Sequence, residues 1–207
     1  MANKIAQITG IITRIRYKIS SKTSMLIYNS LIQPHINYCN IIWASNYKTS
    51  LEKIYLLQKR ALKITLGKRI NYPYNYNKVT SVSNRPTQNI SIFVESNHLS
   101  IYDTNKMQIA KLIFKTLHNN LSPPCYKNMF VTTSMIHSHG TRAEQRQDLF
   151  LKQAKSNIRK FATSVRGPEI WNSIPINIRQ SHSLYEFLHL AAQILFVIKH
   201  VISFDNS

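Results

Sequence analysis

The stretch TSLEKIYLLQKRALKITLG, residues 49–67, indicates the fold class most clearly. Its apolar side chains recur every three or four residues, which predicts a helix with one buried face. Thr49 and Glu52 predict a capping box, in which the Thr oxygen accepts the Glu52 amide and the Glu side chain reaches back. Gly67 suits the C-terminal cap of this helix. The predicted buried face consists of Leu51, Ile54, Tyr55, Gln58, Ala61, Leu62 and Thr65.

The residues before this helix also show helical spacing. Isoleucines at positions 5, 8, 12, 15 and 19 predict a first helix over residues 5–19. A second helix is expected to begin near Thr23 and to end at Pro34, because proline lacks an amide donor and clashes one turn back. Its predicted inward-facing side chains are Leu26, Ile27, Ser30 and Leu31.

The C-terminal half is expected to be mostly helical as well. Asp103 or Thr104 is the predicted cap of one helix, and Ser183 and Glu186 form the capping box of the last one. Between them, alternation over residues 158–165 predicts a short strand, and Gly167-Pro168 is expected to start a helical turn. The predicted fold is therefore mainly α, a helical bundle followed by a small helical region with one or two short strands.

Composition divides the chain into three segments. Residues 1–69 form a basic helical segment, residues 70–87 a linker rich in Tyr, Asn and Pro, and residues 88–207 a second helical region. The linker tyrosines either stack on bases or lie on a neighbouring domain. These tyrosines are Tyr72, Tyr74 and Tyr76.

Positive charge is the main functional indication. The chain has 27 Lys and Arg against 8 Asp and Glu, a net charge of +19. Residues 1–69 hold twelve basic side chains and one acid, which leaves +11, whereas residues 88–207 hold thirteen against seven, which leaves +6. Such a field attracts polyanions, so nucleic acid is the expected partner. The alternatives are an acidic membrane surface, an acidic protein, or a basic surface that only adds solubility.

No complete catalytic, cofactor or metal centre is expected. The four glycines are isolated, which excludes a phosphate-cradling glycine loop, and no two acids form an Asp-Asp pair. Glu144 and Asp148, with Arg142 and Arg146 between them, favour a helical salt-bridge face. A zinc site can be imagined, but the spacing of its ligands is poor. A thiol site can also be imagined, but it has no orienting third group, and its cysteine is expected to be a buried packing residue. Their residues are Cys125, His137 and His139 with a distant His118 or His98 for zinc, and Cys39 with His35 for a thiol.

Two widely spaced cysteines fit a reduced compartment, and the N-terminus lacks the apolar core of a signal peptide. The most apolar stretch, residues 184–204, is interrupted by polar side chains and is expected to be a buried helix rather than a membrane span. An intracellular location, nuclear or cytoplasmic, is therefore expected.

Several motifs in order resemble a known family. They are LIYNSLIQPHINYCNIIWA (26–44), LQKRALKI (57–64), LSIYDTNKMQIAK (99–111), IHSHGTR (136–142) and RGPEIWNSIP (166–175). Together they resemble the C-terminal portion of reverse transcriptases from non-LTR retrotransposons, transposable elements of the jockey and chicken-repeat kind. The resemblance covers nearly the whole chain. Four motif residues are interpreted as structural: Trp43, Gly167, Pro168 and Trp171.

The resemblance implies a thumb over residues 1–69 and a post-thumb region over 88–207 of an RNA-directed DNA polymerase. In that family the thumb contacts the phosphate backbone of the bound RNA–DNA hybrid or RNA, independently of base sequence. The palm, with its Asp-Asp catalytic motif, is absent here and is expected before Met1, which makes the chain a remnant or fragment that is not itself an enzyme. The expected phosphate contacts are Arg14, Arg16, Lys18, Lys59, Arg60, Lys63, Lys68 and Arg69. The alternatives are a structural or interaction module, or an unstable relic.

Overall fold

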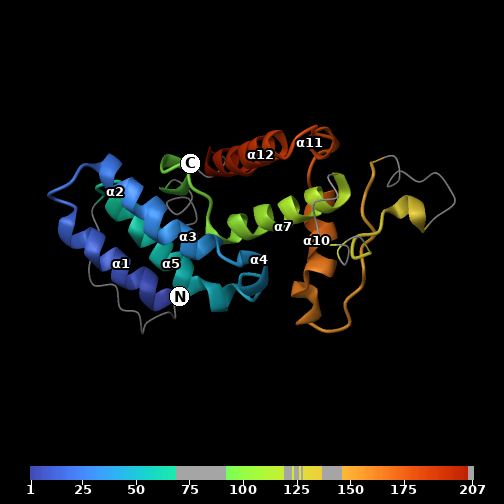
Figure 1. Ribbon diagram of the computed structural model, residues 1–207, viewed down its shortest axis with the longest axis horizontal. Coiled ribbons are helices and arrows are strands. Elements are labelled where there is room, and N and C mark those ends of the chain that lie inside the picture. The colour runs from blue at the N-terminus through green and yellow to red at the C-terminus, as the bar shows by residue number, and fades with distance from the viewer. Residues whose placement is uncertain (69–91, 119–122, 124–125, 127, 137–145, 205–207) are drawn as a thin grey trace. The chain divides into compact units, whose positions relative to one another are not determined.

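The computed structural model describes residues 1–68, 92–118, 123, 126, 128–136 and 146–204 (Figure 1). The secondary structure of these residues is helical, which confirms the predicted mainly α fold. The only β pairing among them is an isolated antiparallel bridge between Thr132 and Leu149. The elements are α1 (Ala2–Ile15), α2 (Ser21–Ile27), the π-helical turn η1 (Tyr28–Ile32), α3 (Gln33–Asn37), α4 (Asn40–Trp43), α5 (Lys48–Thr65), α7 (Ile101–His118), the 3₁₀ turns η2 (Thr133–Met135) and η3 (Arg159–Phe161), α10 (Thr163–Asn172), α11 (Ile176–Arg179) and α12 (Leu184–Phe204).

The chain divides into two compact units. Unit 1 comprises Met1–Cys39, Tyr47–Tyr102 and Phe196–Ser207, and unit 2 comprises Asn40–Asn46 and Asp103–Leu195. Residues 92–102 therefore pack with the basic N-terminal helices, although the sequence grouped them with the region from residue 88 onward. The predicted linker at 70–87, with its tyrosines, lies outside the described residues.

Unit 1 is built on the packing of α1 against α5. Helix α1 buries Ile5 and Ile12 completely, as its isoleucine spacing predicts, but it ends at Ile15 rather than at the predicted residue 19. Helix α5 buries Leu57, Ala61 and Leu62 on the facing side. Complete burial of a leucine or isoleucine side chain stabilises the fold by roughly 1.5–3 kcal/mol.

A buried glutamine organises the centre of unit 1. Gln58 is fully buried, and its Nε2 donates to the Leu99 carbonyl at 3.0 Å and to the Tyr28 hydroxyl at 3.3 Å. Its Oε1 accepts the Ile101 amide at 3.0 Å, at the start of α7. This helix therefore begins before the predicted caps Asp103 and Thr104, because a side chain from α5 satisfies its first amide. Burial also raises the pKa of the Tyr28 hydroxyl.

The structure contradicts the predicted start of α5 and confirms its predicted end. The capping box is wrong, since the helix begins at Lys48 and its cap residue Tyr47 makes no side-chain hydrogen bond. The glycine cap is confirmed: Gly67 has φ +69°, its amide donates to Ile64, and the Lys68 amide donates to Lys63. These two bonds form a Schellman motif, which satisfies the last carbonyls of the helix.

Pro34 does not end the second helix. The helix continues from α2 through η1 into α3, and the Gln33 amide donates to the Tyr28 carbonyl five residues back. This π turn accommodates the missing proline amide and rotates the following face. Tyr28, Ile32 and Ile36 face inward, whereas Leu26 is 61% and Leu31 46% exposed. The predicted inward face of this helix is therefore wrong.

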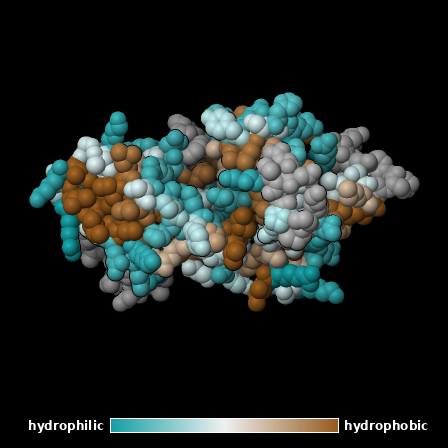
Figure 2. Space-filling model, viewed as in Figure 1, coloured by the Kyte–Doolittle hydropathy of each residue, from teal (hydrophilic) through white to brown (hydrophobic). Residues whose placement is uncertain are grey.

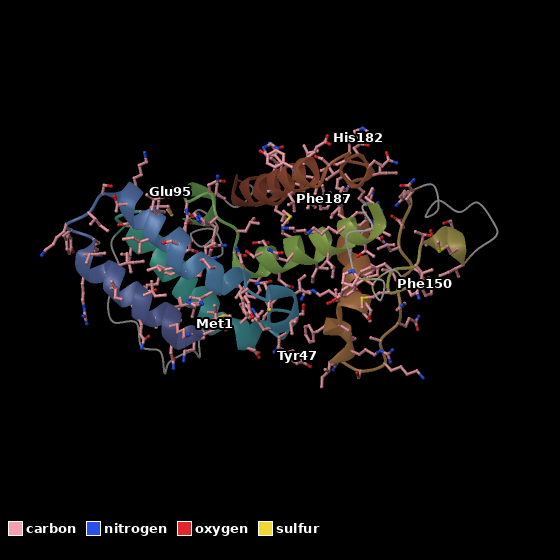
Figure 3. All side chains as sticks on the ribbon, viewed as in Figure 1. Met1, Tyr47, Glu95, Phe150, His182 and Phe187 are labelled. Atoms are coloured by element: carbon pink, nitrogen blue, oxygen red, sulfur yellow. The ribbon has the colours of Figure 1, made fainter. Side chains whose placement is uncertain are left out.

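Unit 2 has an aromatic core. The Phe114 ring of α7 lies 4.5 Å from that of Phe187, which is labelled in Figure 3, and Trp171 lies 5.8 Å from Phe187. A Cβ on Gly167 would approach Phe130 Cε1 to 2.9 Å, so α10 needs glycine there. The burial of Gly167, Pro168 and Trp171 in this helix is consistent with the structural role predicted for them.

The strand predicted over residues 158–165 is wrong. This segment forms η3 and the first turn of α10, and Gly167-Pro168 lies inside that helix rather than at its start. Val165, Pro168 and Trp171 are buried at three-residue intervals, a helical spacing that begins where the alternating pattern ends. The packing of these three buried side chains therefore outweighs the short alternating pattern, and the segment is helical.

The start of α12 follows its predicted capping box. The Glu186 amide donates to Ser183 Oγ at 3.1 Å, and the Glu186 carboxylate accepts the His182 amide at 3.1 Å. The reciprocal bond thus goes to the residue before the cap. No helix within the described residues has both the length and the apolar character needed to cross a membrane.

Candidate nucleic-acid interface

The predicted phosphate contacts lie on two segments of unit 1. Arg14 lies in the last turn of α1, Arg16 caps that helix, and Lys18 follows. Lys59, Arg60 and Lys63 lie on α5, and Lys68 follows its glycine cap. Arg69 lies outside the described residues.

A pocket of about 360 Å³ brings two of these cations together. The end of α1 and the start of α2 line it with Arg16, Tyr17, Ser21 and Ser24. The end of α5 lines it with Ile64, Thr65, Gly67 and Lys68. The other described contacts do not line it: Arg14, Lys18, Lys59, Arg60 and Lys63. We call this cavity the Arg16–Lys68 pocket.

Arg16 is only partly engaged by its neighbours. Its guanidinium donates to the Tyr17 hydroxyl, and its central carbon lies 4.4 Å from the centroid of the Tyr17 ring. The Nε atom is buried and makes no hydrogen bond within the described part of the chain. A guanidinium has five N–H donors, so Arg16 retains donors for an anion.

Lys68 forms an ion pair with Glu95, which is labelled in Figure 3. The two side chains are 40% and 47% exposed. Exposed pairs of this kind contribute about 0–1 kcal/mol, and a polyanion can replace the carboxylate. Glu95 therefore lowers the local positive charge without locking Lys68 in place.

Lys59 has an unusual charge environment on α5. Burial, and then the charge of Lys63 one turn along, lower its pKa to about 8. Lys59 is thus close to losing its proton in mildly alkaline solution. A bound phosphate would stabilise the protonated amine.

The acids of unit 2 are not arranged as the sequence suggested. Asp148 pairs with Arg179 at 2.9 Å, with the two side chains 15% and 6% exposed. Residues 146–150 are not helical, so Asp148 does not join the predicted salt-bridge face. Glu144 and Arg142 lie outside the described residues.

The described residues support neither the zinc site nor the thiol site considered from the sequence. Cys125, His137 and His139 lie outside the described residues, and the described ones hold no cluster of three or more metal-ligating side chains. Cys39 is exposed and has φ +49°.

Sequence reasoning missed the neutral side chains of the pocket. Ser21 and Ser24 lie on α2, Thr65 lies on α5, and Tyr17 lies on the turn between α1 and α2. Only folding brings these side chains together. The adjacency of Tyr17 to Arg16 was the one local signal available.

Compared with protein-family models, curated proteins and solved structures, the chain matches none of them. The function proposed below therefore depends on the sequence motifs and on the geometry of the Arg16–Lys68 pocket.

Proposed function

We propose that this protein binds nucleic acid through backbone phosphates, as the C-terminal, thumb-containing segment of a non-LTR reverse transcriptase would. Its partner is RNA–DNA hybrid or RNA, held without sequence preference. Catalysis belongs to a palm domain that this sequence does not contain. Arginine and lysine side chains supply the binding energy, so no cofactor or metal takes part.

The observation that supports this proposal most strongly is the convergence of Arg16 and Lys68 on one pocket. The two residues follow the ends of two different helices, α1 and α5. Among the described residues no carboxylate lines the cavity, although Lys68 pairs with Glu95. Arg16 and Lys68 lie in a segment that has twelve basic residues against one acid. Such a cluster of cations attracts phosphates and releases their counterions.

A salt titration tests the proposal. If about six of the basic side chains contact phosphates, the affinity for RNA–DNA hybrid falls with a log–log slope of roughly −5. Filter binding from low to moderate salt measures this slope. A protein with no measurable affinity for the hybrid at low salt would rule the proposal out.

A second candidate function is protein interaction, supported by exposed apolar side chains on unit 1. Ile11, Leu26 and Leu31 are each at least 46% exposed. Figure 2 shows a hydrophobic area over the region of α1 and α2. Exposed apolar patches mark binding or aggregation surfaces. Charge reversals at Arg16 and Lys68 that leave nucleic-acid binding intact would favour this function over the first.

A further inference from the structure

The Arg16–Lys68 pocket has an aromatic rim that duplex binding through phosphates does not use. Tyr17 is 81% exposed, although it lines a pocket. The Arg16 guanidinium lies over the Tyr17 ring at 4.4 Å, and the exposure of the ring leaves its opposite side accessible. A planar cation and an aromatic ring thus form a two-layer platform at the mouth of a cationic cavity.

The interior of the pocket suits a phosphate group. Arg16 and Lys68 provide the positive charge, and Ser21 and Ser24 provide hydroxyl groups. The Thr65 hydroxyl lines the cavity but donates to the Leu62 carbonyl at 2.8 Å, so it is not a donor to the phosphate. Ser24 and Thr65 are 2% and 1% exposed, so these two positions are built into the fold. The Schellman cap at Gly67 satisfies the nearby carbonyls of Lys63 and Ile64. Those carbonyls therefore already have hydrogen-bond partners within the helix cap.

The exposed platform favours an unpaired nucleotide over a base pair. Bases within a duplex are covered on both faces by their neighbours, and extracting one costs a few kcal/mol. An unpaired base offers a free face, and its stacking on an aromatic side chain is favourable for every base. A ligand that combines an accessible base with a phosphate matches both parts of this site.

We propose that Tyr17 and the Arg16–Lys68 pocket form a subsite for one nucleotide of single-stranded nucleic acid. Its base stacks on Tyr17, and its phosphate enters the pocket. This inference rests on the proposed nucleic-acid function and adds the strandedness of the ligand. It also gives Tyr17 a role that a purely electrostatic surface does not require.

Removal of the ring tests the stacking half of the subsite. The full chain is titrated against labelled oligo(dT) of about twelve nucleotides and against an RNA–DNA hybrid, with fluorescence anisotropy as the readout. Tyr17→Ala is expected to weaken oligo(dT) binding by roughly 5- to 100-fold, the equivalent of about 1–3 kcal/mol at 1.4 kcal/mol per tenfold. Tyr17→Phe, which keeps the ring, and Tyr185→Ala, which removes an equally exposed tyrosine from unit 2, are expected to change it less than about twofold.

Added negative charge tests the phosphate half. Ser21 is the first residue of α2 and is exposed, so Ser21→Glu is compatible with the helix. It is expected to weaken oligo(dT) binding by about tenfold, because the carboxylate faces the same cavity as the phosphate. Thr23→Glu makes the same charge change two residues away, at a position that does not line the pocket, and is expected to have a smaller effect.

The outcomes separate this inference from the proposed function. Wild-type binding to hybrid, together with an unchanged affinity of Tyr17→Ala for oligo(dT), would overturn the subsite and leave phosphate binding standing. An equal loss on hybrid and oligo(dT) would also overturn it. If the wild-type chain bound oligo(dT) but no hybrid, and Tyr17→Ala lost that binding, the subsite would stand and the duplex function would fall. Failure of the wild-type chain to bind either ligand would reject both.

Discussion

The Oε1 atom of Gln58 accepts the amide of Ile101 at 3.0 Å, so a side chain of α5 caps the start of α7. The same side chain donates to Leu99 and to Tyr28. Replacement by leucine would keep the volume and leave these buried groups without their partner. Gln58→Leu is therefore expected to lower the free energy of unfolding by about 3 kcal/mol.

Urea denaturation followed by circular dichroism measures this loss. Gln193→Leu is the control, since that glutamine lies exposed on α12. Gln58→Glu would keep the acceptor for Ile101 and lose the amide donor, so an intermediate loss is expected. A Gln58→Leu variant as stable as the wild type would show that the cap contributes nothing.

Arg179 and Asp148 are expected to stabilise unit 2 only as a pair. Because both side chains are largely buried, Arg179→Met would leave a carboxylate without its counter-ion, at a cost of about 3–5 kcal/mol. The double variant Arg179→Met with Asp148→Leu should recover most of that loss. Thermal unfolding of both single variants and the double variant gives the coupling energy, and additive losses would contradict a paired role.

Lys59 is expected to make the stability of the fold depend on pH. Its pKa of about 8 in the folded chain lies below the usual value of 10.5, so the folded state binds fewer protons than the unfolded state between these values. The free energy of unfolding contributed by this group therefore rises with pH from about 8 to 10.5. Below pH 8 the folded state carries the full cost of keeping the Lys59 amine protonated in its partly buried position. Because Lys59 is only partly buried, Lys59→Met should stabilise the fold by about 1 kcal/mol at pH 7.

The same gain should disappear above pH 10.5, where the unfolded-state lysine is also neutral. Lys53→Met, at an exposed position of the same helix, is the control for loss of one charge. Comparison of the melting temperatures of the variants and the wild type across pH 7 to 10.5 isolates the contribution of Lys59. An identical pH profile for Lys59→Met and the wild type would contradict the shifted pKa.

Gly167 is expected to tolerate no side chain while Phe130 is present. An added Cβ would lie 2.9 Å from Phe130 Cε1 and 3.2 Å from Ile113 Cδ1. Gly167→Ala should therefore cost about 1–3 kcal/mol through overpacking. Addition of Phe130→Leu should offset part of this cost, and the absence of such rescue in thermal melts would point to a different cause.

Local patterns predicted those parts of the fold in which a few neighbouring residues decide the outcome. The isoleucine stripe of α1, the glycine cap at Gly67 and the Ser183 cap all depend on residues within about two turns of helix. The predicted inward face of the second helix fails already before the π turn, because Leu26 is exposed while Ser24 and Tyr28 are buried. The apolar spacing alone does not distinguish the two faces, since a buried serine carries no hydrophobic signal.

Long-range pairing explains what the sequence could not predict. Arg179 and Asp148 are 31 residues apart, and Gln58 and Ile101 are 43 apart. Charge alone identified Arg16 and Lys68 as candidates, but not that they share a pocket with Tyr17 and Ser24. Their convergence depends on the packing of α1 and α2 against α5, which is a tertiary property.

The central claim is that Arg16 and Lys68 contact phosphates, and the salt dependence of hybrid binding tests it most directly. We expect Arg16→Ala with Lys68→Ala to weaken binding at low salt and to make the log–log slope less negative by about 2, because each lost phosphate contact removes about 0.9. The matched control, Lys48→Ala with Lys53→Ala, removes two exposed charges of α5 outside the predicted contact set and should leave the slope nearly unchanged. Equal slopes for the wild type and the Arg16 and Lys68 double variant would contradict the account.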